Sequence, residues 1–160
     1  MIDLSVHLIT YNNETHIEDT ITSILQQKVN FNYEIVVGDD CSTDRTLEII
    51  NQYASQHPGL FKIKKNEMQL GILRNFKATL DRCTGNYIFD IAGDDLLKGN
   101  TALQKMVTIL KSDQSLGYVD SGYDRLDDQN KTITQFKNKD SINPTETVYK
   151  SNVLLGKITP

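Results

Sequence analysis

Two acidic pairs in the 160-residue sequence stand where apolar runs end, and both have the chemistry to hold a cation or a sugar hydroxyl. Asp39-Asp40 follows the run at residues 34–37, and Asp94-Asp95 follows the run at residues 87–91. If both runs are parallel strands of one sheet, the carboxylates meet at its carboxyl edge and repel one another. Mg²⁺ and Mn²⁺ prefer oxygen ligands, so a divalent cation that also holds a diphosphate is the natural candidate between them.

A third strand end offers groups that suit a nucleotide. Thr10-Tyr11-Asn12 follows the apolar run at residues 4–10. Tyr11 can stack on a planar base, and Asp40 can accept a hydrogen bond from a ring N–H or a ribose hydroxyl. Because ligands of open α/β sheets bind beyond the carboxyl ends of the strands, three such ends together indicate a binding site.

Each motif alone also has an ordinary structural interpretation. Asp39-Asp40-Cys41-Ser42 is typical of a turn whose side chains cap a helix. Gly93-Asp94-Asp95 is equally typical of a solvated loop, and Tyr11 is by itself a surface aromatic. His7, inside an apolar run, is expected to be a core residue with satisfied hydrogen bonds. Only the joint placement at three strand ends favours function.

The elements that position these groups alternate between strand and helix patterns. Strands are expected at residues 4–10, 34–37, 60–64, 87–91 and 118–126, with a hairpin partner at 132–136. Helices are expected at about 15–27, 42–57, 72–83 and 101–111. This alternation predicts one α/β domain over residues 1–160, a sandwich with a mostly parallel central sheet.

Local signals predict where these helices begin and end. Thr15-x-x-Glu18 matches a capping box, and Ser42, Thr43 and Asp44 are good helix caps. Gly85 is placed like the glycine that follows a helix.

Composition narrows the class of protein. The net charge of −4 disfavours nucleic acid and anionic membranes as partners attracted by bulk charge. The two cysteines, Cys41 and Cys83, are too few for a disulfide framework and are expected to be buried thiols in a reducing compartment. No apolar run approaches the roughly 20 residues of a membrane-spanning helix. We therefore expect a cytoplasmic protein.

Several familiar nucleotide-binding and catalytic motifs are absent from the sequence. There is no Gly-x-Gly-x-x-Gly and no Gly-Lys-Ser/Thr phosphate loop, which disfavours Rossmann dehydrogenases and P-loop enzymes. No Ser-His-Asp or Cys-His arrangement is evident.

The motifs taken together resemble the opening of a family 2 glycosyltransferase with the GT-A fold. The matching stretches are residues 6–13, 23–27, 34–46, 66–75 (with Gly71, Arg74 and Asn75), 85–88 and Ala92-Gly93-Asp94-Asp95. They run in order over about residues 4–115. Ala92-Gly93-Asp94-Asp95 stands where this family carries its Asp-x-Asp metal motif.

The resemblance implies an inverting transfer of a sugar from a nucleotide diphosphate, usually UDP-linked, with Mn²⁺ or Mg²⁺. Thr10 and Tyr11 would contact the base, Asp39 and Asp40 would read its edge, and Arg74 would lie near the phosphates. Asp94 would hold the ribose, and Asp95, with Asp94, the metal. The acceptor would be a glycan or a lipid-linked sugar of cell-surface polysaccharide synthesis, and the family allows peripheral association with the inner face of a membrane.

The sequence departs from the family pattern in two ways. Ala92 replaces the first Asp of Asp-x-Asp, which predicts weaker metal binding. The general base and the acceptor wall belong to a later half of the domain, so we expect a truncated donor-binding part with its base beyond Pro160 and little turnover on its own.

Two other classes of protein remain open. A nucleotidyltransferase shares the α/β layout but normally carries a Gly-rich basic loop after its first strand, unlike Tyr11-Asn12-Asn13-Glu14. A non-enzymatic receiver-like signalling module also gathers carboxylates at a sheet edge. Its acidic pair should follow the first strand, where this chain has Thr10-Tyr11-Asn12.

Overall fold

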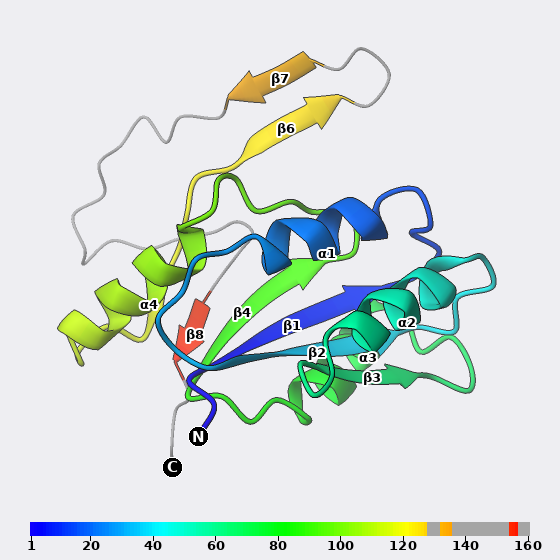
Figure 1. Cartoon of the computed structure of the whole chain (residues 1–160), viewed down its shortest axis with the longest axis horizontal. Coiled ribbons are helices and arrows are strands. Elements are labelled where there is room, and N and C mark those ends of the chain that lie inside the picture. Colours follow the sequence, from blue (N-terminus) through cyan, green and yellow to red (C-terminus); the bar gives the residue numbers. More distant parts are fainter. Residues whose placement is uncertain (128–131, 136–153, 157–160) are drawn as a thin grey trace.

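The computed structural model describes residues 1–127, 132–135 and 154–156 and places a twisted sheet between two layers of helices (Figure 1). Its strands are β1 (Leu4–Thr10), β2 (Tyr33–Asp39), β3 (Phe61–Lys65), β4 (Tyr87–Ala92), β5 (Tyr118–Val119) and β8 (Leu154–Gly156), in the order β3-β2-β1-β4-β8-β5. Strands β1 to β4 pair in parallel, and β8 runs antiparallel to β4 and β5. The predicted mostly parallel α/β sandwich is confirmed.

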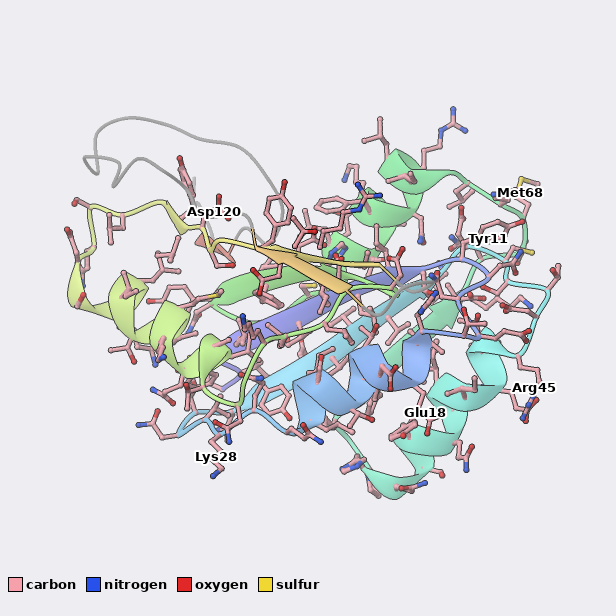
Figure 2. The ribbon with its side chains drawn as sticks, turned by 90° about the horizontal axis from the view of Figure 1, so that it is seen from above. Tyr11, Glu18, Lys28, Arg45, Met68 and Asp120 are labelled. Carbon is pink, nitrogen blue, oxygen red and sulfur yellow. The ribbon has the colours of Figure 1, made fainter. Side chains whose placement is uncertain are left out.

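Four helices cover the two faces of the sheet. They are α1 (Ile17–Leu25), α2 (Thr46–Gln56), α3 (Ile72–Leu80) and α4 (Ala102–Ser112). Figure 2 shows α1 and α2 on one side of the sheet and α3 on the other. The main core lies on the first side, where Leu4, Val6 and Leu8 of β1 pack in one buried cluster with apolar residues of α1, α2 and α4. Alternation along β1 sends Ser5 and His7 to the opposite face.

His7 is the centre of the second face and has no solvent exposure. Its Nδ1 lies 2.6 Å from Oδ1 of Asp90 on β4, and its Nε2 lies 3.0 Å from the carbonyl oxygen of Phe76 on α3. The Phe76 ring meets the imidazole edge-on, with the ring centroids 4.5 Å apart. The prediction that His7 is a satisfied core residue is confirmed, and His7 joins β1, β4 and α3.

Glu34 fixes the amino edge of the sheet on this second face. Its carboxylate accepts hydrogen bonds from Ser5 Oγ (2.7 Å) and Thr84 N (2.8 Å) and pairs with Lys62 Nζ at 2.6 Å. Burial raises the pKa of the Glu34 carboxyl, but the hydrogen bonds from Lys62, Ser5 and Thr84 outweigh burial and leave the pKa below its usual value. The buried carboxylate of Glu34 is therefore stabilised in its charged form and links β2 to the segments that carry Ser5, Lys62 and Thr84.

The single strand expected at residues 118–126 is wrong. The polar stretch Asp120-Ser121-Gly122 separates β5, which joins the main sheet beside β8, from β6 (Asp124–Asp127), which pairs with β7 (Thr132–Gln135). The predicted hairpin is thereby confirmed for β6 and β7. Of the turn that the polar run at residues 127–130 predicts, Asp127 belongs to β6 instead, and residues 128–130 lie outside the described residues. Strand β8 was not predicted, because its three residues are too few to show a period.

Three local expectations are also wrong. The capping box expected at Thr15 and Glu18 does not form, and helix α1 begins at Ile17 without a side-chain cap. The carbonyl oxygen of Asn13, rather than the Thr15 side chain, accepts hydrogen bonds from the backbone N–H groups of His16 and Ile17. Helix α3 ends at Leu80, and Gly85 serves close packing, since a Cβ there would lie 2.5 Å from the backbone nitrogen of Ser5.

The third wrong expectation concerns the thiols. Cys41 and Cys83 are only half-buried, because both follow the ends of elements rather than lying in the core. Partial burial nevertheless raises the pKa of the Cys83 thiol to about 11.

Gly38 of β2 lies directly under α3, and a Cβ at this position would overlap Thr79 Oγ1 and lie 2.9 Å from Asn75 Oδ1. We expect Gly38→Ala to lower the free energy of unfolding by about 1–3 kcal/mol, since α3 must shift away from the sheet. Gly117→Ala is the matched control, because a Cβ there meets nothing within 4 Å. Urea denaturation of both variants measures the difference, and equal midpoints would contradict the close packing of α3.

Candidate functional site

The candidate site lies where the strand order reverses. From β1 the chain proceeds to β2 and β3 on one side and then crosses to β4 on the other side of β1. The register pairs Thr10 with Asp39 and Ile9 with Ala92, so β1, β2 and β4 end at one edge of the sheet (Figure 1). The three predicted strand ends are thus brought together at the switch point, where ligands of open α/β sheets bind.

The loop after β1 is held in one conformation. Asn13 Oδ1 accepts hydrogen bonds from Thr10 Oγ1 (3.0 Å) and Tyr11 N (3.1 Å). Asn12 adopts a left-handed backbone with φ of 50°, and its N–H donates to Ser42 Oγ at 2.9 Å. Thr10 is almost buried and shapes the loop, whereas the Tyr11 side chain is 41% exposed at the sheet edge. Tyr11 is therefore accessible to a ligand that stacks on its ring.

Asp39 is buried and its carboxylate is engaged within the protein. It accepts hydrogen bonds from Ser42 N at 3.1 Å and from Ser42 Oγ. This turn carries Cys41 in a left-handed conformation with φ of 66°. Because Ser42 also accepts from Asn12, Asp39 couples the loop after β2 to the loop after β1. The geometry thus gives Asp39 the turn-forming role that was its ordinary interpretation.

Asp40 is 4% exposed and also accepts hydrogen bonds from the protein. Its oxygens accept hydrogen bonds from Leu70 N (2.7 Å), Gly71 N (2.8 Å) and Asn66 Nδ2 (3.0 Å). These donors belong to the loop at residues 66–71 and to the start of α3. Asp40 therefore anchors that loop, and in this conformation both of its oxygens are occupied.

The second acidic pair is exposed, in contrast to the first. Its turn is fixed from two sides, because Gly93 N donates to Ile9 O (2.9 Å) and Thr20 Oγ1 donates to Gly93 O (3.0 Å). Partial desolvation raises the pKa of the Asp95 carboxyl, and the negative charges of Asp94 and Asp90 raise it further. Asp94 and Asp95 form a rigidly held pair of mutually repelling carboxylates.

A divalent cation that also binds phosphate fits this pair. Within the described residues no group of three or more His, Cys, Asp or Glu side chains is arranged to hold a metal. Mg²⁺ and Mn²⁺ at diphosphate sites commonly use only one or two carboxylates together with phosphate oxygens and water. Partial desolvation and the charge of Asp94 both raise the pKa of Asp95, and a cation at this place would offset the second of these causes.

Arg74 lies in the first turn of α3 and is exposed. None of the described residues forms an ion pair with it. Its position depends on Asp40, which holds Gly71 at the start of the same helix. Within the described part of the chain, Arg74 is thus an exposed cation without an ion-pair partner, and it lies on helix α3, whose start is held by Asp40.

Sequence reasoning missed the residues that hold the loops in place. Asn13 and Ser42 fasten the loop after β1, and Asn66 links Asp40 to Asn75 by donating to both. Asn66 and Asn75 lie in the stretch that supports the family resemblance, but no hydrophobic period marks them as buried.

The described helices include none that is long and apolar enough to cross a membrane.

Comparison with known proteins places this geometry in a family. The family Glycosyl transferase family 2 matches residues 5–157. The putative glycosyltransferase EpsE of Bacillus subtilis is 34% identical over 119 residues, covering 74% of this chain and 42% of EpsE. The chain spans only 31% of the length of its mycobacterial relatives, whose function is uncharacterised.

Two solved structures share the fold. Mannosyltransferase PcManGT from Pyrobaculum calidifontis, in complex with GDP-Man and Mn²⁺, aligns with a TM-score of 0.68 at 27% identity, over 78% of this chain and 36% of PcManGT. TarS residues 1–349 of S. aureus, in complex with UDP-GlcNAc, align with a TM-score of 0.63 at 26% identity, over 73% of this chain and 33% of TarS. The chain belongs to glycosyl transferase family 2, and its sheet is the GT-A sheet.

The anchoring role of Asp40 predicts a large loss of stability in Asp40→Ala. The variant leaves three donors without their acceptor, so we expect the free energy of unfolding to fall by about 2–3 kcal/mol. Asp94→Ala, which removes an exposed carboxylate of the other pair, should change it by about 0.5 kcal/mol or less. Urea denaturation at pH 7 measures both. If the two variants unfolded alike, Asp40 would not anchor α3.

The raised pKa of Asp95 predicts a pH-dependent gain in Asp95→Asn. The folded protein holds the Asp95 proton more tightly than the unfolded chain does, so this carboxyl opposes folding increasingly as pH rises through its raised pKa. Without added metal, Asp95→Asn should therefore be more stable than wild type at pH 7 and should lose that advantage towards pH 3. Thermal melts across this range measure the difference, and a gain largest at low pH would contradict the sign of the shift.

Proposed function

We propose that this chain is the donor-binding part of an inverting glycosyltransferase that takes its sugar from a nucleotide diphosphate, with UDP as the first candidate. The observation that carries the proposal is the switch-point edge, where the exposed ring of Tyr11 and the repelling pair Asp94-Asp95 lie at the ends of adjacent parallel strands. A base-stacking surface next to a cation site matches the two ends of a nucleotide diphosphate. The relatives bound to UDP-GlcNAc and to GDP-Man support this class of donor.

The residues divide the work of binding the donor. Tyr11 stacks on the base, and Thr10 and Asp39 hold the loops that frame it. Asp40 supports the loop at residues 66–71 and so places Arg74, whose charge suits the phosphates. Asp94 is assigned to the ribose hydroxyls, and Asp95, together with Asp94, to the cation. This division retains every residue expected from the sequence, but it gives Asp39 and Asp40 their effect through the loops they hold.

A bound Mn²⁺ or Mg²⁺ would neutralise the diphosphate and stabilise it as a leaving group. The chain itself supplies the carboxylates on a fixed turn, since Thr20 Oγ1 donates a hydrogen bond to Gly93 O. The general base that removes the acceptor proton is not assigned to any described residue, and the chain spans 31% of its mycobacterial relatives and 42% of EpsE. We place the whole protein in the cytoplasm, acting on a glycan or lipid-linked acceptor of cell-surface polysaccharide synthesis.

A thermal-shift and calorimetry panel with UDP, GDP, CDP and ADP, each with and without Mn²⁺, tests the proposal. A ligand that binds only the folded state at 100 times its Kd adds about 2.7 kcal/mol of stability. We expect one nucleotide to stabilise the chain, and to do so more strongly with Mn²⁺. Tyr11→Ala should weaken the binding of that nucleotide by about 5- to 100-fold, because the stacking is lost. Asp95→Asn should remove only the additional stabilisation that depends on Mn²⁺.

Tyr53→Phe on α2 is the matched aromatic control and should bind like wild type, because Tyr53 contacts Glu18 and Thr22 away from the three strand ends. Equal stabilisation by all four nucleotides, or Mn²⁺ dependence that survives in Asp95→Asn, contradicts the site. Binding of a phosphate analogue with Mg²⁺ and no nucleotide preference would favour a receiver-like module.

A further inference from the structure

Three large apolar side chains are exposed together at one corner of the molecule. Met68 is 67% exposed, Ile72 77% and Leu73 85%, which makes them, apart from the first residue, the most exposed large apolar side chains in the described part of the chain. They lie within six residues on the anchored loop and the first turn of α3, and Figure 2 shows Met68 at the same end of the molecule as Tyr11. We call Met68, Ile72 and Leu73 the α3 patch. Contiguous exposed apolar surface usually marks an interaction site.

Helix α3 buries polar residues and exposes apolar ones in its first turn, the reverse of an ordinary surface helix. The residues it buries are polar, Asn75 at 2% and Thr79 at 1% exposure, while Ile72 and Leu73 face solvent. Asn75 holds this orientation by donating from Nδ2 to Gly38 O at 2.9 Å and by accepting from Asn66 at 2.9 Å. The helix therefore cannot rotate to bury its apolar turn without breaking these bonds. The exposure is built into the fold.

The segment that carries the patch has the opposite charge to the chain as a whole. Residues 61–78 contain five basic side chains and one acidic one, and because Lys62 is paired with Glu34 and Lys77 with Asp81, a net charge of +2 is left on this segment in a chain whose net charge is −4. Lys64 lies beside α3 because it pairs in register with Gly38, and both Lys64 and Arg74 lack an ion-pair partner among the described residues. This face can therefore attract an anionic surface although the chain as a whole carries a net negative charge.

We propose that the α3 patch binds the surface of an anionic lipid bilayer, with Leu73, Ile72 and Met68 inserted among the lipids and Lys64 facing the headgroups. Apolar side chains flanked by basic ones are the combination that such an interface attracts. A second copy of the chain fits less well, since an isologous contact would bring two positively charged segments face to face.

The patch is tied to the candidate donor site by a single carboxylate. Asp40 accepts from Leu70 N and Gly71 N, immediately before Ile72. A bilayer against the patch would therefore lie next to the end of β2 and present its lipid headgroups to the site. If the proposed function holds, this assigns the acceptor to the class of lipid-linked sugars. The lipid contact itself does not depend on the nucleotide site.

The chain contains no tryptophan, so Leu73→Trp introduces a single reporter at a solvent-exposed position. We expect its emission to shift to the blue with vesicles of phosphatidylcholine and phosphatidylglycerol, and to stay unchanged with phosphatidylcholine alone. Vesicle flotation of the otherwise unchanged chain should show the same lipid preference, weakened by added salt. Leu73→Ser should reduce binding at least about tenfold, because a large apolar side chain no longer leaves water.

Ile109→Ser is the matched control, since Ile109 is a 45% exposed apolar residue on α4. It should bind vesicles like wild type. The proposal is overturned if anionic vesicles are not bound, if Leu73→Ser binds as well as Ile109→Ser, or if sedimentation shows a dimer that Leu73→Ser dissociates. Nucleotide binding is measured separately without vesicles, so vesicle binding without nucleotide binding rejects only the proposed function, and the reverse result rejects only the lipid contact.

Discussion

The carboxylate of Asp40 is the interaction on which the rest of the site depends. It joins the end of β2 to the loop at residues 66–71 through two backbone N–H groups and one side-chain amide. Arg74 and the α3 patch lie on this loop and on the first turn of α3, so Asp40 helps to set their positions together with Asn75. Asp39 holds the loop after β1, because its partner Ser42 accepts a hydrogen bond from Asn12 in the loop that carries Tyr11. The residues at the end of β2 thus hold the loops of the site in place and do not themselves line it.

The carboxylates of the protein separate into two groups with different surroundings. Glu34, Asp39 and Asp40 are buried and accept several hydrogen bonds each, which is the condition under which a buried charge is tolerated. Asp94 and Asp95 are exposed, and the pKa of Asp95 is raised by desolvation and by its acidic neighbours. Donors within the protein stabilise the first group, whereas the second must obtain its positive partner from outside. This contrast distinguishes structural from ligand-binding acids at a single sheet edge.

Much of the fold could be predicted from the sequence, because the apolar runs at β1, β2 and β4 and the helical periods are local signals. The placement of Thr10, Asp39 and Asp95 at one edge followed from the same runs once they were taken as parallel. The burial of Asp39 and Asp40 could not be predicted, since it depends on donors as distant as Gly71. Strand β8 and the start of α1 at Ile17 could not be predicted for the same reason, because their bounds are set by pairing with β4 and by Asn13 rather than by their own residues.

The polar underside of α3 has a thermodynamic consequence. The helix is held to the sheet by hydrogen bonds of Asn75 and by the contact between Phe76 and His7, and its own buried residues, Asn75 and Thr79, are polar. Heat capacity changes on unfolding come mainly from exposed apolar area, so detaching α3 alone carries a smaller heat capacity change than detaching α1 or α4. Its attachment will therefore depend on temperature less steeply than the α1 and α4 face, where Leu4, Val6 and Leu8 are fully buried. The two sides of one sheet thus have different stability curves, and on cooling the apolar side weakens first.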